Sequence, residues 1–408
     1  MPKRKQTRRK EAQHKTVPGL ATLSVWAGEQ GEHWMGSTQV PIAQSVSFGF
    51  RDVDEWLSVA QGRRPGHIYS RNTNPTVAAF EEKVRRLENA EAATSFSSGM
   101  AAISNALFTL LSPGERVVSV KDTYGGTNKI FIEFLPRFHI SVTLCDTTDH
   151  AAIEAAIAKG AKLVYLETPT NPTNKVIDIA RISAAAHRHQ ATVVVDNTFA
   201  TPINQQPLRL GADLVIHSAT KFLGGHADAM GGIVCGNRDL VRRIFHFREI
   251  TGASLDPMSA YLLLRGMKTL ALRVGKQNES ALEIARFLQK HPRVTQVFYP
   301  GLESHPNHQI ARRQMSGFGG VLSFAPQGGF GAVKRLLPHL HFAHLAANLG
   351  AVETVAGPPA TTSHVESTPA ERKASGIPEA LIRYSVGIED VADLIADLQR
   401  ALEKAFAA

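Results

Sequence analysis

One lysine stands among hydroxyl groups and glycines, directly after an apolar stretch. Residues 217–226 read HSATKFLGGH and follow the strand-like run 212–216. A lysine that forms an imine with an aldehyde cofactor must be partly buried and must lose its proton easily, so it belongs at a strand end. Ser218 and Thr220 could turn two hydroxyls toward an anion beside this amine. The run indicates that Lys221 is a Schiff-base lysine, although lysines in such runs are more often surface residues.

A carboxylate at the end of another strand-like run strengthens this interpretation. Residues 191–197 read ATVVVDN, in which a β-branched run delivers Asp196. Pyridoxal phosphate (PLP) requires such a group, because a buried carboxylate keeps the ring nitrogen protonated and the ring able to accept electrons. Asp196 and Lys221 end two strands with room for one crossover between them, which would bring both to one sheet edge. A cap or turn role for Asp196 is the ordinary alternative.

A phosphate group needs a cradle, and residues 97–100 offer one. They read SSGM and lead into the helical pattern of residues 101–108. N–H groups at a helix start attract phosphate, and glycine allows it to approach closely. The commoner use of such a serine is an N-cap. With Lys221 and Asp196 in the same α/β region, the phosphate cradle is favoured.

Six segments in a fixed order carry a resemblance to a known family. They are YSRNTNPT (69–76), SGMAAI (98–103), TYGGT (123–127), ETPTNP (167–172), VDNTF (195–199) and the run around Lys221. Together they span about residues 69–386 and resemble the Cys/Met-metabolism PLP-dependent enzymes. This group contains cystathionine γ-synthase, cystathionine γ-lyase, methionine γ-lyase and the homoserine-ester sulfhydrylases.

The resemblance implies a role for each residue around the cofactor. Lys221 would form the Schiff base, Asp196 would pair with the ring nitrogen, and Tyr124 would stack on the ring. The phosphate would be bound by Gly99, Met100, Ser218 and Thr220.

The resemblance also implies that one active site needs two chains of a homotetramer, built as a dimer of dimers. Tyr69 and Arg71 would reach the phosphate from the neighbouring subunit, and Tyr69 would contact the substrate as well. Asn171 would lie near the ring hydroxyl and the substrate carboxylate, and Asn348 would contact the substrate. Arg383 would grip the carboxylate, because its fork of donors suits that group bidentately.

Two of these residues have ordinary structural alternatives. Tyr124 precedes two glycines and could be a turn aromatic that shields the core. Arg383 could be a surface ion-pair partner of Glu389 or Asp390. Without the resemblance these alternatives would be preferred; with it, the roles at the active site are favoured.

Cofactor motifs do not separate the reactions of this family. A thiol or sulfide that replaces the γ substituent makes the enzyme a synthase or sulfhydrylase, whereas release of an oxoacid and ammonia makes it a lyase. Gly126 stands where the methionine γ-lyases carry cysteine. Asn348, in ANLGA (347–351), lacks the preceding acid of many cystathionine enzymes and is closer to the sulfhydrylase pattern. PATTSH (359–364) also fits the sulfhydrylases, with Ser363 replacing a usual threonine.

These departures favour γ-replacement on an activated homoserine ester. A cystathionine or methionine γ-lyase is the first alternative. A PLP enzyme of another reaction type, such as an aminotransferase, and a binding protein that lacks the chemistry remain open as well.

The alternation of elements predicts an α/β fold. Strand-like runs lie at 115–120, 140–145, 161–166, 191–195, 212–216 and 232–235, and helical stretches include 99–111, 151–159 and 179–189. Such alternation predicts a mostly parallel sheet between helices, and the resemblance implies PLP-dependent transferase fold type I, as in aspartate aminotransferase. Longer helices at 261–272, 279–289 and 390–406 indicate a smaller α/β C-terminal domain. We expect a basic disordered head and N-terminal arm over 1–65, a PLP-binding domain over 66–256 and the C-terminal domain over 257–408.

Composition fits a large globular enzyme, with 43% hydrophobic and 20% charged residues. No apolar run is long enough to span a bilayer, and we expect no membrane partner and no secretory signal. Cys145 and Cys235 make neither a disulfide framework nor a metal spacing. A reducing cytoplasm is therefore the expected location.

The net charge of +9 is concentrated near the N-terminus, where residues 3–15 hold seven basic residues and one acidic residue. The rest of the chain is only mildly basic, so no nucleic-acid partner is expected. His339 and His341 alternate as metal ligands on a strand would, but their segment brings no acid or cysteine to complete a site. No metal is therefore predicted.

Overall fold

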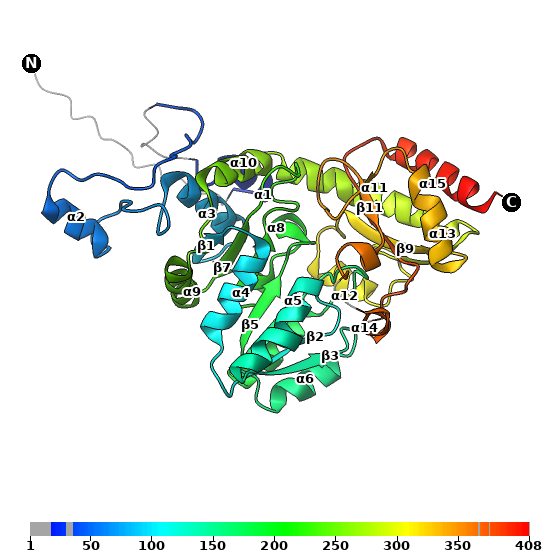
Figure 1. Ribbon diagram of the computed structural model, residues 1–408, viewed down its shortest axis with the longest axis horizontal. Helices are drawn as coiled ribbons and strands as arrows, with labels where there is room; N and C mark the ends of the chain where they lie inside the picture. Colours follow the sequence, from blue (N-terminus) through cyan, green and yellow to red (C-terminus); the bar gives the residue numbers. More distant parts are fainter. Residues whose placement is uncertain (1–17, 30–35, 366–367, 375, 408) are drawn as a thin grey trace, which may run out of the picture.

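A computed structural model describes residues 18–29, 36–365, 368–374 and 376–407. Residues 1–17, which carry most of the predicted basic head, lie outside this part. The described residues form a seven-stranded and a five-stranded sheet, and Figure 1 shows the smaller sheet to one side of the larger. None of the helices in the described ranges is both long and apolar enough to cross a bilayer.

The larger sheet is parallel except for one strand. Its strands are β1 Ala92–Phe96, β2 Arg116–Val120, β3 Ser141–Cys145, β4 Leu163–Glu167, β5 Thr192–Asp196, β6 Leu214–Ser218 and β7 Gly232–Gly236. The order is β1-β7-β6-β5-β4-β2-β3, and β7 runs antiparallel to both of its neighbours. Six strands match predicted runs. The sequence does not predict β1, because its small and polar residues, AATSF, become a strand only through their pairing with β7.

Helices cover both faces of the larger sheet. They are α4 Gly99–Leu110, α5 Gly125–Lys129, α6 His150–Ala158, α7 Ile179–Arg188, α8 Thr201–Asn204 and α9 Arg238–Thr251. Successive residues of β2 point to opposite faces: Val117 packs in a core with α4 and α9, and Val118 packs in a core with α6 and α7. The predicted α/β class with a mostly parallel, helix-covered sheet is therefore confirmed.

The second sheet has the order β10-β11-β12-β9-β8. Its strands are β8 Val294–Phe298, β9 Val321–Pro326, β10 His344–Leu345, β11 Val355–Gly357 and β12 Ile382–Ser385. The helices of this half are α10 Pro257–Met267, α11 Leu270–Lys290, α12 His308–Gln314, α13 Gly329–Leu336, α14 Pro369–Ala374 and α15 Val391–Phe406. Side chains of α11, α13 and α15 pack on β9 and β12 around the buried Phe324 and Tyr384. The domain boundary at 256/257 falls between α9 and α10 and stays a prediction.

The predicted helix boundaries near α11 are wrong. The sequence places one helix over 261–272 and another over 279–289. In the structure α10 ends at Met267, and after residues 268–269 α11 runs without interruption from Leu270 to Lys290. Arg273 and Gln277 break the apolar period of this helix although both are buried. They donate hydrogen bonds to main-chain carbonyls, Arg273 to Phe222 at 2.9 Å and Gln277 to Ala351 at 2.9 Å. Tertiary hydrogen bonds therefore extend the helix past the point where its amphipathic pattern fails.

The N-terminal part of the chain holds α1 Leu20–Trp26, α2 Val53–Ala60 and α3 Pro75–Leu87. Side chains of α1 and α3 are buried in a core with α10, whereas the segment around α2 forms an arm. Figure 1 shows α2 at the end of an extended segment that leads away from both sheets. No residue of α2 is buried, and Trp56 is 51% exposed. The arm therefore presents its surface outward, and Tyr69 lies on the stretch that returns from α2 to α3.

Candidate active site

A cavity of about 290 Å³ lies at the carboxyl ends of β4, β5 and β6. Parallel strands bring the residues that follow them to one sheet edge, which is the usual ligand site of such sheets. The start of α4 and Arg383 of β12 also line the cavity. The predicted residues that line it are Gly99, Met100, Tyr124, Asn171, Asp196, Ser218, Thr220, Lys221 and Arg383.

Lys221 reaches the cavity from the turn that follows β6. Its Nζ donates a hydrogen bond to Oδ1 of Asn348 at 3.1 Å. Burial, helped by the charge of Arg383, lowers the pKa of Lys221 from 10.5 to about 8. The amine is therefore neutral far more often than an exposed lysine at the same pH, as a nucleophile toward an aldehyde must be.

Asp196 ends β5 and is 8% exposed. Its Oδ1 accepts the Thr198 N–H at 2.9 Å, and its Oδ2 accepts the Tyr165 hydroxyl at 3.3 Å. Burial raises the pKa of Asp196, and the hydrogen bonds from Thr198 oppose that rise. A cation beside Asp196 would offset the cost of its buried charge. Sequence reasoning gave Tyr165 no role, because a tyrosine inside a strand looks like an ordinary core residue.

The start of α4 faces Ser218. Ser98 caps the helix by accepting the Ala101 N–H at 3.1 Å, so the N-cap role, the commoner alternative for this serine, is also present. The first N–H groups of a helix lack partners within it and remain available to an anion. A Cβ on Gly99 would lie 2.7 Å from the Cβ of Ser218, so only glycine lets the start of α4 lie this close to Ser218. Thr220 lines the cavity, and its hydroxyl accepts the Gly231 N–H at 3.0 Å.

Glu167, at the end of β4, holds two predicted site residues in place. Its carboxylate accepts the N–H of Tyr124 at 2.7 Å and the N–H of Asn171 at 3.0 Å. Burial and the neighbouring Asp196 raise the pKa of Glu167 well above its ordinary value. Its place in the ETPTNP segment was the available signal, but the sequence did not indicate what it binds. Tyr124 is 39% exposed and lines the cavity, so it is not an aromatic that shields the core.

Arg383 is buried, with 5% of its surface exposed, and it is not a surface ion-pair partner. Its Nη1 donates to Oδ1 of Asn171 at 3.2 Å, and its Nη2 donates to the main-chain oxygen of Asn348 at 3.0 Å. Glu389 instead accepts from the N–H of Thr354 at 2.7 Å. Both acceptors of Arg383 are neutral oxygens, so its charge is available to a carboxylate in the cavity.

Tyr69 and Arg71 do not line the cavity of their own chain. Both are exposed, and the Arg71 guanidinium stacks over the Tyr69 ring, 5.1 Å from its centroid. Their predicted contact with the cofactor of a neighbouring subunit stays a prediction.

The residues around the cavity fit PLP. Lys221 supplies an amine with a lowered pKa, and Asp196 supplies a buried acid for the ring nitrogen. The start of α4, which Gly99 brings close to Ser218 on the cavity wall, suits a phosphate. Tyr124, on the cavity wall, could cover a ring bound between these groups.

The lowered pKa of Lys221 predicts how the apoprotein captures PLP. Only the neutral amine attacks an aldehyde, so the capture rate should rise with pH and level off above about 8 instead of rising toward 10.5. Borohydride trapping of the bound cofactor at a series of pH values measures this rate, with Lys221→Ala as the blank. A midpoint near 10.5 would contradict the assigned pKa.

The histidine segment does not form the strand on which the metal alternative depended. Residues 337–339 form a short 3₁₀ helix, in which His339 is half-buried, and His341 is exposed. An acid does lie nearby, although the segment itself holds none: Asp397 accepts the N–H of His341 at 2.9 Å. Among the described residues, no group of three or more His, Cys, Asp or Glu side chains is arranged to hold a metal ion.

Comparisons with known proteins find relatives that match nearly the whole chain. L-methionine gamma-lyase from Fusobacterium nucleatum subsp. polymorphum is 43% identical over 389 residues, which cover 95% of this chain and 98% of that protein. O-succinylhomoserine sulfhydrylase from Pseudomonas aeruginosa is 41% identical and covers 93% of this chain and 94% of that protein. The crystal structure of cystathionine gamma synthase from Xanthomonas oryzae pv. oryzae in complex with cystathionine matches with a TM-score of 0.91 at 37% identity, covering 96% of this chain and 99% of that one.

The family model for Cys/Met metabolism PLP-dependent enzymes matches residues 21–403. This match confirms the resemblance found in the sequence, and with it PLP as the cofactor and fold type I as the fold. The chain belongs to the Cys/Met metabolism PLP-dependent enzyme family.

Proposed function

We propose that this enzyme catalyses γ-replacement on an activated homoserine ester. In this reaction the bond between Cγ and the ester oxygen breaks and releases a carboxylic acid, while a bond forms between Cγ and the sulfur of sulfide or a thiol. When bound, PLP supplies the electron sink for this chemistry. Lys221 holds the cofactor and moves the α proton, and Arg383 holds the substrate carboxylate.

The observation that carries the proposal is that both acids of the cavity wall already have partners. Glu167 accepts two main-chain N–H groups, and Asp196, which we assign to the ring nitrogen, accepts the N–H of Thr198. Among the cavity-lining residues that the structure describes, no other Asp or Glu occurs. Cystathionine carries a second ammonium group far from the reacting carbon, which would need an acid. A substrate whose distal part is an ester has no such need.

Gly126 supports γ-replacement over methionine γ-elimination. A Cβ at this position would lie 2.9 Å from the Tyr124 ring and 3.1 Å from the Met100 sulfur. The cysteine that methionine γ-lyases carry here would therefore require Tyr124 or Met100 to shift. The ring of Tyr124 in this chain is positioned for a glycine neighbour.

A γ-lyase is the second candidate, because relatives named L-methionine gamma-lyase reach 43% identity. Such an enzyme would release 2-oxobutanoate, ammonia and the sulfur-bearing group without an acceptor thiol. Lys221 and Arg383 would serve this reaction equally well. Which of the two reactions occurs therefore depends on whether sulfide or a thiol adds at Cγ.

Product analysis separates the two reactions. The purified holoenzyme is incubated with cystathionine, methionine, O-acetylhomoserine or O-succinylhomoserine, each with and without sulfide. We expect homocysteine from at least one ester, only when sulfide is present, and little product from methionine. Rapid release of 2-oxobutanoate from methionine or cystathionine, with the esters inert, would overturn the proposal.

The assembly, the acceptor and the location belong to the same proposal. We propose a homotetramer with active sites shared between subunits, sulfide or a small thiol as the second substrate, and a cytoplasmic location. The exposed arm that carries Tyr69 and Arg71 supports the shared site.

Mixing two inactive variants tests the shared site. Arg71→Ala should weaken cofactor retention in the partner's site, because a phosphate loses a charged donor there. In a mixed dimer of Arg71→Ala and Lys221→Ala chains, one site carries both defects and the other carries neither. Activity should therefore return after subunit exchange, to about a quarter of the wild-type value per site for random pairing. If labelled mixed dimers form and no activity returns, the shared-site proposal is wrong.

A further inference from the structure

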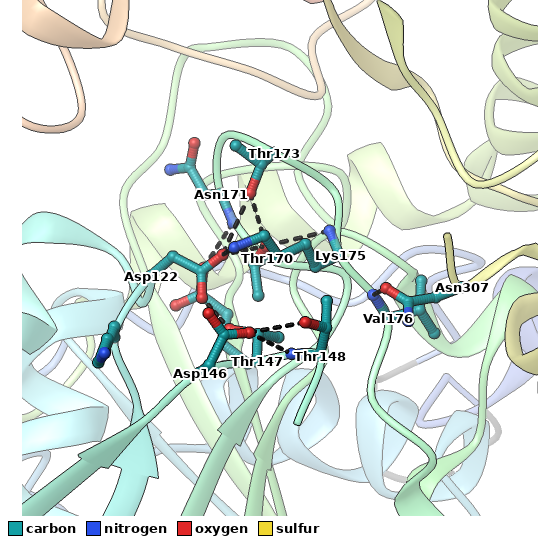
Figure 2. A network of polar contacts seen from close by, with 12 residues as sticks. Asp122, Asp146, Thr147, Thr148, Thr170, Asn171, Thr173, Lys175, Val176 and Asn307 are labelled. Atoms are coloured by element: carbon teal, nitrogen blue, oxygen red, sulfur yellow. Dashed lines mark hydrogen bonds and ion pairs between the residues drawn. The ribbon is translucent and has the colours of Figure 1, made fainter. Parts of the chain in front are cut away.

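One buried carboxylate, Asp122, lies two residues before Tyr124 and is only 1% exposed. Its Oδ1 accepts the hydroxyl of Thr147, two residues after β3. Its Oδ2 accepts the hydroxyls of Thr170 at 3.2 Å and Thr173 at 3.1 Å, and the Lys175 ammonium at 3.1 Å. Figure 2 shows these donors converging on Asp122 from two directions.

These contacts close the loop that follows β4. The N–H of Thr170 donates to the Lys175 carbonyl at 3.0 Å, and the N–H of Lys175 donates back to the Thr170 hydroxyl at 3.1 Å. Asn171 lies within this closed turn (Figure 2). Asp122 therefore connects the end of β2 to the loop that carries Asn171.

The loop in turn contacts Arg383 and the second sheet. Oδ1 of Asn171 accepts from Nη1 of Arg383 at 3.2 Å. The carbonyl of Pro172 accepts the Ser323 hydroxyl of β9 at 2.7 Å, and the N–H of Val176 donates to Asn307 at 3.2 Å. A change in the loop would consequently move one of the two acceptors that orient the Arg383 guanidinium.

Lys175 is the cation that this arrangement requires. Its side chain is 17% exposed and Asp122 is buried, so the pair is largely withdrawn from water. Burial raises the pKa of Asp122, and the charge of Lys175 opposes this rise. Without Lys175 the buried carboxylate would lose its only charged partner among the contacts described above, and it would have to take up a proton or draw in water.

We propose that the Asp122–Lys175 ion pair is a positioning device for substrate recognition: it holds the Asn171 loop so that Arg383 is oriented for the substrate's α-carboxylate. Lys175 acts through Asn171 and Arg383 and does not touch the substrate. This inference rests on the proposed action on an α-amino acid, but not on whether the reaction is a replacement or an elimination.

Two unreactive ligands that differ by a carboxylate test this role. L-norleucine lacks a γ leaving group, and n-pentylamine is the same molecule without its carboxylate. Binding of each to the holoenzyme is followed through the visible absorbance of the cofactor. We expect Lys175→Met to weaken norleucine binding by about tenfold or more, the scale of a misplaced positioning group, and to change pentylamine binding by less than about twofold.

Matched variants separate this role from a general loss of stability. Lys175→Arg keeps the cation and should bind norleucine nearly as the wild type does. Lys162→Met removes an exposed lysine, 3.8 Å from Glu115, and should leave both ligands unaffected. If Lys175→Met does not fold, Thr173→Val removes one donor to Asp122 and should give a smaller change in the same direction.

Two results would overturn the inference. One is unchanged norleucine binding in Lys175→Met or, if that variant does not fold, unchanged norleucine binding in Thr173→Val. The other is an equal loss for norleucine and pentylamine, which would assign the ion pair to the cofactor site or the fold. Both results would leave the γ-replacement proposal standing, because neither ligand has a group on Cγ that can leave.

Discussion

Replacing Lys221 with alanine is expected to lower turnover by at least about a thousandfold while leaving the protein folded. The amine does two things in the site: it attaches the cofactor and it moves the α proton, and loss of a positioned acid or base alone costs about 10² to 10⁴ in rate. Among the described residues, the Lys221 side chain donates one hydrogen bond, to Asn348, so its removal should cost little stability. Steady-state rates and thermal unfolding of the same preparation measure both effects.

Lys290→Ala is the matched control, because Lys290 is an exposed lysine at the end of α11. It should keep full activity and the visible absorbance of the bound cofactor. Wild-type rates in Lys221→Ala, with that absorbance intact, would show that another group holds the cofactor.

The second large effect is expected for Asp196→Asn, which keeps the side-chain shape and removes its charge. The Thr198 N–H can still donate to the amide oxygen, so the cofactor should remain bound. The ring nitrogen loses the partner that keeps it protonated, and the rate should fall by about a hundredfold or more, as when one charge-stabilising group is removed from an active site. Cofactor content and turnover of the variant are measured together.

Asp239→Asn serves as the control, since it makes the same change in a side chain that is 81% exposed, whereas Asp196 is buried. Near-normal turnover in Asp196→Asn would show that Asp196 is not the acid that keeps the ring nitrogen protonated, and Glu167 would be the first other acid to test. A variant that cannot retain PLP at all would point to a role in binding instead of in catalysis.

Much of the fold follows from local sequence patterns. Several parallel strands are short, buried apolar runs that lead to residues which the sequence marks for chemistry: β5 ends at Asp196, and Lys221 follows β6. Local patterns fail where long-range contacts decide the structure. The strand β1 depends on pairing with β7, and α11 continues through Arg273 because that side chain donates to carbonyls far away in the chain.

The active site divides in the same way. Lys221, Asp196 and Arg383 belong to recognisable segments, and the structure brings all three to one cavity. Glu167 and Asp122 could not be assigned from sequence, since an acid after a strand looks the same whether it caps a turn or holds a catalytic loop. Which donors face such an acid is decided by the packing of several segments.

The most direct test of the central claim is the partition of one activated homoserine ester between two products as sulfide is raised. Homocysteine, 2-oxobutanoate and the released acid are quantified in the same reaction. We expect homocysteine and 2-oxobutanoate together to equal the released acid, with the homocysteine share rising toward one-for-one with the acid as sulfide increases. Release of 2-oxobutanoate and ammonia at a rate independent of sulfide, without homocysteine, would contradict this expectation.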